Sequence, residues 1–289
     1  MSLSGTLYCY RNPLESRGEE DIRQPWYDTT CCPPNLERTF ASIPGYLYST
    51  SPSGVYVNLY HSSTLDWHLE NGTGLKLSQQ TKYPWDGDIT LKVSPAEAAT
   101  FTLYLRIPGW SSKATVTLDG KPAPGRPKPG DYFAIRREWK AASTVRLQLD
   151  MAPHLVVANI LVREDFGRVA VQRGPLLYCL EQVDQEERGS IFDVALSASA
   201  GPSWGFTSEF RPDILGGIVL LKHKGMATAK PLSQEPLYQT IERMPRERER
   251  EVNLTFIPYY AWANRLPGAM EVWIPYLETR SALPVQKAR

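Results

Sequence analysis

The chain has 289 residues, and its 32 Lys and Arg residues against 31 Asp and Glu residues give a formal net charge of +1. This balance gives no reason to expect a nucleic-acid partner or an anionic membrane surface, and no run of about 18 apolar residues predicts a transmembrane helix. The length predicts two domains, and the 24 Pro, 20 Gly and 15 Tyr residues favour a mainly β protein rich in turns. No secretory signal is recognisable at the N-terminus, so a cytoplasmic location is expected.

Residues 1–50 differ from the rest, because they contain the one convincing helix. Pro33 and Pro34 predict its start, since proline is favoured in the first helical turn. Apolar residues then follow at helical spacing, at Leu36, Phe40, Ile43 and Leu47. Pro44-Gly45 should end or kink the helix. A lone amphipathic helix is not stable, so its apolar face should dock on a sheet, pair with a second copy or stay partly exposed.

From about residue 54 the hydrophobic period changes to two, which is typical of strands with one buried face. Turn pairs such as Pro108-Gly109 and Asp119-Gly120 separate the candidate strands. The strands are expected at 55–60, 65–69, 74–81, 89–93, 100–107, 114–118, 132–136 and 145–149. Many short strands at this spacing predict an antiparallel β-sandwich over residues 51–158.

A second β-sandwich is expected over residues 159–289. Its candidate strands are 169–171, 176–180, 218–222, 252–257 and 270–276. Residues 182–213 are polar and weakly patterned, which predicts a long loop. The alternating charges of Arg246 to Glu251 are interpreted as a solvated approach to the next strand.

Adjacent thiols at Cys31 and Cys32 are the strongest local signal for chemistry. They lie just before a predicted helix N-terminus, where the helix dipole favours a thiolate. By residue type alone the pair is open to three interpretations: inert buried cysteines, metal ligands or a catalytic nucleophile. A tetrahedral zinc ion needs four ligands, and only two stand here. Cys179 lies in an apolar strand and is expected in the core.

Other residues offer weaker chemistry. No pair of carboxylates is recognisable as glycosidase machinery, and the four histidines lack metal-binding spacing. The aromatic tract 257–265, which reads Ile-Pro-Tyr-Tyr-Ala-Trp-Ala-Asn-Arg, could line a sugar-binding surface or pack between domains.

Several motifs, in order, resemble glycoside hydrolase family 127, the β-L-arabinofuranosidase family. The most specific is Cys31-Cys32-Pro33-Pro34-Asn35, preceded by a Tyr-Cys-Tyr-Arg-Asn-Pro-Leu-Glu-Ser run at 8–16 and by Trp26-Tyr27. The similarity continues through Leu-Arg-Ile-Pro-Gly-Trp at 105–110, Tyr-Phe-Ala-Ile at 132–135, Gln-Arg-Gly-Pro-Leu at 172–176 and the aromatic tract. It covers nearly the whole chain.

The resemblance implies an (α/α)6 catalytic barrel followed by two β-sandwich domains, and a zinc ion held by one glutamate and three cysteines. It implies that Cys31 is the nucleophile of a retaining mechanism with a glycosyl-thioether intermediate. Cys31 and Cys32 would both be zinc ligands, with zinc holding Cys31 as a thiolate. Tyr10, just before the Asn-Pro pair, would lie near the sugar.

The resemblance covers only the C-terminal portion of the family's length. Its acid/base glutamate and remaining zinc ligands lie upstream of the matching segment, so residues 1–50 are expected to be the end of the barrel. We therefore expect a truncated retaining, zinc-dependent hydrolase, inactive by itself and with zinc absent or weakly bound. Arabinofuranoside-containing glycans are the expected partners of the parent protein, and a homodimer is a further expectation. The alternative is a non-catalytic carbohydrate-binding or structural β-sandwich module.

Overall fold

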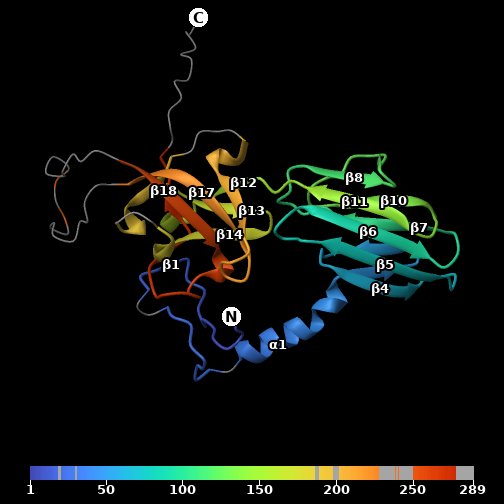
Figure 1. Ribbon diagram of the computed structural model, residues 1–289, viewed down its shortest axis with the longest axis horizontal. Coiled ribbons are helices and arrows are strands. Elements are labelled where there is room, and N and C mark those ends of the chain that lie inside the picture. Colours follow the sequence, from blue (N-terminus) through green and yellow to red (C-terminus); the bar gives the residue numbers. More distant parts are fainter. Residues whose placement is uncertain are drawn as a thin grey trace, which may run out of the picture. The chain divides into compact units, whose positions relative to one another are not determined.

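The computed structural model describes residues 1–18, 21–29, 31–185, 189–197, 202–227, 238, 240 and 250–277. The chain divides into two compact units. Unit 1 consists of Met1–Tyr27 together with Ala152–Arg289, and unit 2 is Asp28–Met151. Within the described ranges the fold is mainly β with a single α-helix, α1, as the sequence predicted (Figure 1).

Unit 2 begins with α1 (Cys32–Ser42) and a short 3-10 helix, η1 (Ile43–Tyr46), followed by two sheets. Pro44 and Gly45 fall in η1, so the α-helix ends just before them, as expected. The four-stranded sheet has the order β10-β7-β3-β2, with β2 at Tyr48–Ser51, β3 at Gly54–Val57, β7 at Ala99–Arg106 and β10 at Tyr132–Trp139. The six-stranded sheet has the order β4-β5-β6-β11-β8-β9, formed by Ser63–His68, Gly74–Thr81, Asp88–Pro95, Ser143–Leu149, Ala114–Leu118 and Lys121–Pro122.

The two sheets of unit 2 enclose one hydrophobic core. Every second residue of their central strands is buried, as in the pattern Leu75, Leu77 on β5 and Leu103, Leu105 on β7. These side chains meet in a single cluster drawn from both sheets. Trp139 is fully buried in it and donates its indole N–H to the Phe101 carbonyl at 3.0 Å. The alternation read from the sequence is therefore the inward face of a sandwich.

One strand pair in unit 2 is parallel, although the sequence predicted antiparallel sheets. β3 runs parallel to β7, with Gly54 opposite Thr102 and Val57 opposite Leu105. A glycine is required at residue 54, because a Cβ there would collide with the Thr102 carbonyl and the φ angle is +155°. The remaining pairings in this sheet and its partner are antiparallel.

The strands of unit 1 form one curled sheet. Its main strand order is β1-β19-β14-β18-β17-β15. In addition, β13 pairs with β14, β12 and β20 each pair with β13, and β16 pairs with β17. The strands are β1 (Glu15–Ser16), β12 (Pro153–Val157), β13 (Arg168–Arg173), β14 (Leu176–Glu181), β15 (Val194–Leu196), β16 (Thr207–Arg211), β17 (Ile218–Ala227), β18 (Arg250–Pro258), β19 (Met270–Glu271) and β20 (Ile274–Pro275). β14 pairs with β13 through Leu176–Tyr178 and with β19 through Leu180 and Glu181, so the sheet splits along this strand.

The prediction of a long loop over residues 182–213 is wrong. The described part of this stretch contains three 3-10 helices, η3 (Gln182–Asp184), η4 (Ile191–Asp193) and η5 (Pro202–Gly205), and the strands β15 and β16. β16 has almost no buried side chains, so its sequence shows no alternation although it pairs with β17 along its full length. Residues 246–249 of the predicted solvated charge run lie outside the described residues.

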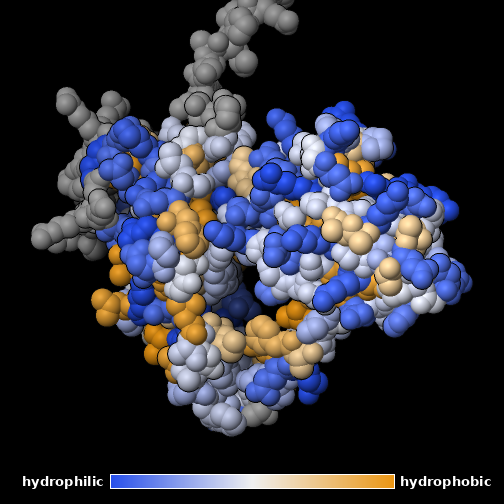
Figure 2. Space-filling view, turned by 45° about the vertical axis from the view of Figure 1, so that its right-hand side comes forward, coloured by the Kyte–Doolittle hydropathy of each residue, from blue (hydrophilic) through white to orange (hydrophobic). Residues whose placement is uncertain are grey.

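Helix α1 has no buried residue. Leu36 is 39% exposed and Phe40 is 52% exposed, so this face is partly exposed in the single chain, and its pairing with a second copy stays a prediction. Figure 2 shows hydrophobic residues interspersed with polar ones on the surface that it displays. In the part of the chain that the structure describes, no helix is long and apolar enough to cross a membrane.

Candidate active site

The two adjacent thiols stand at the first turn of α1. Cys31 occupies the N-cap position and Cys32 is the first helical residue, with prolines at the next two positions. Both side chains are exposed, which rules out the interpretation of the pair as inert core cysteines. The positive end of the α1 dipole lies at this turn and attracts negative charge, although Pro33 and Pro34 have no N–H group to contribute.

The spacing of the two sulfurs suits a shared metal ion. The Cys31 and Cys32 Sγ atoms are 3.6 Å apart, too far for a disulfide bond. Two sulfurs on a tetrahedral zinc, each at about 2.3 Å, would be separated by about 3.8 Å. The described residues nevertheless contain no group of three or more His, Cys, Asp or Glu side chains that could hold a metal. They offer two neighbouring sulfurs, which do not complete a four-ligand site.

Tyr10 lies in a small cluster of tyrosines in unit 1. Its ring centroid is 5.5 Å from that of Tyr27, which also contacts Tyr8 at 5.1 Å. The Tyr27 hydroxyl donates to the Tyr8 carbonyl at 3.2 Å, and Tyr8 exchanges two backbone hydrogen bonds with Gln24. Tyr10 is thus fixed within unit 1, whereas the cysteines belong to unit 2. Their joint role in one site therefore stays a prediction.

The aromatic tract 257–265 holds the N-terminal segment in place. The Arg23 guanidinium donates to the Trp262 carbonyl through Nη2 at 2.7 Å and Nε at 3.2 Å, and to the Tyr260 carbonyl at 3.1 Å. The Tyr259 hydroxyl donates to the Pro13 carbonyl at 2.8 Å. The tract therefore packs against residues of its own unit, and its role as a sugar-binding surface stays a prediction.

A cavity of about 490 Å³ lies between the N-terminal segment and the end of the tract. Arg23 and Asn264 line it, and both are already engaged in holding the segment, because Asn264 Oδ1 accepts the Leu3 N–H at 3.0 Å. The polar groups of this cavity are therefore those that join the two parts of unit 1.

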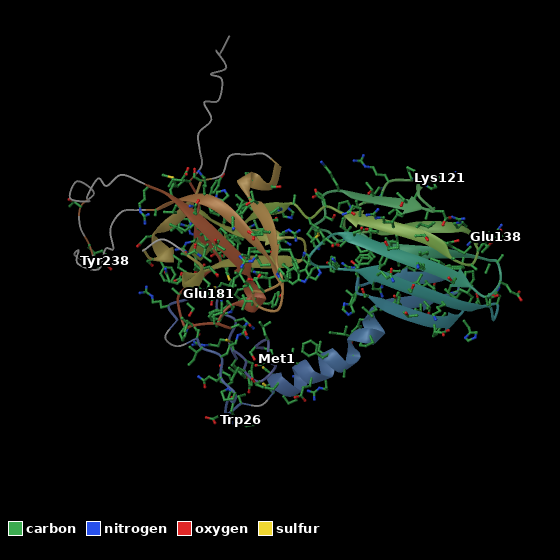
Figure 3. The ribbon with its side chains drawn as sticks, in the orientation of Figure 1. Met1, Trp26, Lys121, Glu138, Glu181 and Tyr238 are labelled. Carbon is green, nitrogen blue, oxygen red and sulfur yellow. The ribbon has the colours of Figure 1, made fainter. Side chains whose placement is uncertain are left out.

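Behind the tract lies an ionic network that the sequence analysis missed. Glu181, labelled in Figure 3, lies at the end of β14 and is 1% exposed. It accepts the Ala263 N–H at 2.9 Å and pairs with Arg265. Arg265 also forms a two-pronged pair with Asp184. Burial alone would lower the pKa of Arg265, but the bonds to Asp184 and Glu181 outweigh it and raise that pKa. The network joins β14 to the tract and so supports the residues that hold Arg23.

A second buried carboxyl, Glu271, was also not anticipated. It is 2% exposed on β19, directly opposite Glu15 of β1. Arg168 Nη1 donates to Glu271 Oε1 at 2.8 Å and lies 3.8 Å from Glu15. Burial raises the pKa of Glu271 to about 7, against the opposing effect of Arg168. Because Glu271 is closed off from solvent, its position suits a structural role at the β1–β19 pair better than a catalytic one.

The two other cysteines lie in different surroundings. Cys179 is fully buried on β14, as predicted, and burial raises its pKa well above the usual value. Cys9 is half-buried in the N-terminal segment, and burial raises its pKa as well, with Arg23 opposing. Neither position favours a thiolate, which leaves the exposed pair as the candidate nucleophile and metal ligands.

Comparison with known families identifies both units. Residues 54–151 match the family model "Beta-L-arabinofuranosidase, GH127 middle domain", and residues 153–275 match "Glycoside hydrolase family 127 C-terminal domain". The chain belongs to glycoside hydrolase family 127. It carries the family's middle and C-terminal domains, as the motif resemblance implied.

Individual members of family 127 agree with this assignment. The chain is 35% identical over 287 residues to a non-reducing end β-L-arabinofuranosidase of Bifidobacterium longum subsp. longum, covering 94% of this chain and 42% of that protein. It is similar to the crystal structure of a family 127 β-L-arabinofuranosidase from Geobacillus stearothermophilus T6, with a TM-score of 0.85, 37% identity and coverage of 96% of this chain and 44% of that one.

A third similar structure is a family 127 β-arabinofuranosidase, with a TM-score of 0.83, 35% identity and coverage of 96% of this chain and 43% of that one. The chain thus spans less than half the length of these relatives.

Proposed function

We propose that this chain is the C-terminal part of a retaining β-L-arabinofuranosidase in which Cys31 is the nucleophile. The observation that carries the proposal is the exposed Cys31-Cys32 pair at the N-terminus of α1 in a chain of family 127. Tyr10 is proposed to contact the sugar, and arabinofuranoside-containing glycans are the proposed substrates.

In the proposed reaction the Cys31 sulfur attacks the anomeric carbon, and the bond from that carbon to the leaving oxygen breaks. The leaving alcohol takes a proton from an acid supplied by the longer protein. Water, giving a proton back to the conjugate base of that acid, then displaces the sulfur, returning the thiolate and releasing the sugar with its original anomeric configuration. The positive end of the α1 dipole favours the anionic form of Cys31 before attack and after release.

Zinc is proposed as a cofactor of the longer protein, with Cys31 and Cys32 as two of its ligands. The 3.6 Å separation of their sulfurs supports this. The metal would favour the thiolate form when bound. Because only two ligands come from the described residues, we propose that the 289-residue chain alone is inactive and retains less than one zinc per chain.

The test uses a protein extended upstream through its natural coding sequence. Cys31→Ala should lower turnover of an aryl β-L-arabinofuranoside by at least about 1,000-fold, because the covalent step loses its nucleophile. Cys9→Ala, which removes a half-buried thiol of unit 1, is the control and should leave turnover within about twofold. Mass spectrometry of Cys32→Ala trapped with substrate should place any sugar adduct on Cys31. Unchanged turnover of Cys31→Ala in a folded protein would overturn the proposal.

A further inference from the structure

The outer face of the four-stranded sheet in unit 2 carries three tyrosines. Tyr56 on β3 and Tyr104 on β7 are directly opposite each other in the parallel pair, and their rings stack with centroids 4.0 Å apart and planes 4° apart. Tyr132 on β10 meets Tyr56 edge-on at 5.3 Å and is 37% exposed. Such stacked and edge-to-face contacts hold aromatic rings in one orientation.

Hydrogen bonds fix two of the three rings further. The Tyr132 hydroxyl donates to Asn58 Oδ1 at 2.7 Å, and Asn58 Nδ2 donates to the Ser49 hydroxyl at 2.7 Å. The Tyr104 hydroxyl lies 3.3 Å from the Ser53 hydroxyl. The cluster is therefore preorganised, which lowers the entropy cost of binding a ligand.

Tyr104 has one face against Tyr56 and the other toward β10. The residue opposite Tyr104 on β10 is Ala134, which is exposed and whose single methyl group leaves the space above it open. A hollow of about 370 Å³ lies along β10; Tyr104 does not line it, and its lining residues are Leu118, Ala123, Pro124, Ala134, Ile135, Arg136 and Arg137. Arg136 is the next outward side chain along β10 and is exposed. An aromatic face, a small floor and a charged donor thus lie together.

The side chains of this face indicate which ligand it fits. The outward residues of β3, β7 and β10 are Tyr56, Thr100, Thr102, Tyr104, Arg106, Tyr132, Ala134, Arg136 and Glu138. None is Val, Leu, Ile, Met or Phe, so the face lacks the apolar patch that an obligate protein interface buries. Two arginines with one glutamate do not form the basic stripe of a nucleic-acid surface. Tyrosine faces beside hydroxyl and guanidinium donors suit a neutral ring with apolar C–H faces and polar edges.

We propose that Tyr104, Ala134 and Arg136 form a carbohydrate-binding site, in which one ring of a neutral glycan stacks on the outward face of Tyr104. Arg136 donates to a ring hydroxyl, and Ala134 provides the floor. The site would hold the glycan chain without taking part in its cleavage. The inference does not depend on the proposed catalysis by Cys31, because it is tested by binding in the absence of turnover.

The experiment titrates the intact 289-residue chain with arabinan-derived oligosaccharides, followed by calorimetry and saturation-transfer NMR. Tyr104→Ala should weaken binding about tenfold, a factor that corresponds to about 1.4 kcal/mol. Tyr104→Phe keeps the ring and should bind within about twofold of the unchanged protein. Ala134→Gln fills the space beside Tyr104 at an exposed position and should abolish saturation transfer while the fold is kept.

Trp67→Ala is the matched control, because Trp67 is an exposed aromatic residue on β4 of the other sheet and is 45% exposed. It should leave binding unchanged. Circular dichroism of each variant checks folding, and Ala134→Gln decides the result if Tyr104→Ala does not fold. Absence of sugar binding by the unchanged chain, or normal binding by Ala134→Gln, would overturn the proposal. An equal loss in Trp67→Ala would place the binding elsewhere and overturn it too.

Discussion

Glu271 is a carboxyl group that the fold holds almost entirely out of solvent. Burial disfavours its charged form, Arg168 restores only part of what solvation would provide, and the like charge of Glu15 on β1 adds to the effect of burial. One of its oxygens, Oε2, has no hydrogen-bond partner. A buried acceptor left in this state is destabilising when charged, and protonation relieves it.

The raised pKa of Glu271 predicts a pH-dependent stability. Its folded pKa of about 7 exceeds the unfolded value, so the folded state binds the extra proton between about pH 4.5 and 7. Stability should therefore fall as pH rises through this window, by at most about 1.4 kcal/mol per pH unit. Glu271→Gln, which is neutral at every pH, should remove this slope in denaturant titrations from pH 5 to 8.

Glu251→Gln is the control for this prediction, because Glu251 pairs with Lys224 at the surface, where its side chain is 60% exposed. Its slope should match that of the unchanged chain. An identical slope in Glu271→Gln would show that Glu271 is ionised in the folded state throughout the range.

At this scale the sequence pointed to the candidate thiols but not to the residues around Tyr10. Cys31 and Cys32 are adjacent, and the two residues after them, Pro33 and Pro34, indicate the start of a helix. The Arg23 bonds to the Trp262 carbonyl join residues 239 positions apart. Glu181 and Arg265 are also far apart in the chain. No local sequence pattern indicates contacts between residues so far apart. In the sequence, Arg23, Glu181 and Arg265 look like ordinary charged surface residues.

Among the elements, strands with one buried face were predicted well. β5, β6, β7 and β11 alternate between core and solvent, and this alternation is visible in the sequence. β15 and β16 were missed because a three-residue strand is too short to show a period and an exposed strand has none. Their pairing with β17 comes from backbone hydrogen bonds, which carry little side-chain signature.

The β8–β9 hairpin shows how a turn pair specifies local geometry. Leu118 and Lys121 are opposite each other across Asp119 and Gly120, whose φ angles are +48° and +81°. These are the positive values of the two-residue turn that Asp-Gly favours. The Asp119 carboxylate accepts the Thr144 N–H at 2.8 Å and pairs with Arg137 at 3.0 Å. The Thr144 bond is the largest of the effects that lower the pKa of Asp119.

Gly120→Ala should therefore destabilise unit 2 by about 1 kcal/mol, because alanine is strained at this φ angle although the space around it is open. Thermal unfolding followed by circular dichroism measures the change. Gly109→Ala is the matched control: this glycine also has open space around it but has no positive φ angle. It should leave unit 2 equally or more stable, and an equal loss in both variants would contradict the turn argument.

For the molecule as a whole, the two units differ in how the chain builds them. Unit 2 is a continuous stretch, and its core cluster is drawn from residues 55–149. Unit 1 needs both ends of the described chain, because β1 pairs with β19 and the Leu14 carbonyl accepts the Val272 N–H at 2.9 Å. Arg23 and Tyr259 add bonds between the same two segments. Residues 1–27 are thus structural members of the second β domain.

This difference predicts separate responses to removal of residues 1–27. Unit 1 would lose β1, including Glu15 opposite Glu271, and the hydrogen bonds that Arg23 and Tyr259 make between the two segments. Unit 2 would lose none of its strands. A loss of about 2–3 kcal/mol in a unit of this size lowers its melting temperature by roughly 5–10 °C. Calorimetry of residues 28–289 should therefore show one transition shifted down and one unchanged, relative to the 289-residue chain. Arg23→Gln in the intact chain should shift the same transition by a smaller amount. Equal shifts of both transitions, or of neither, would contradict the assignment of the N-terminal segment to unit 1.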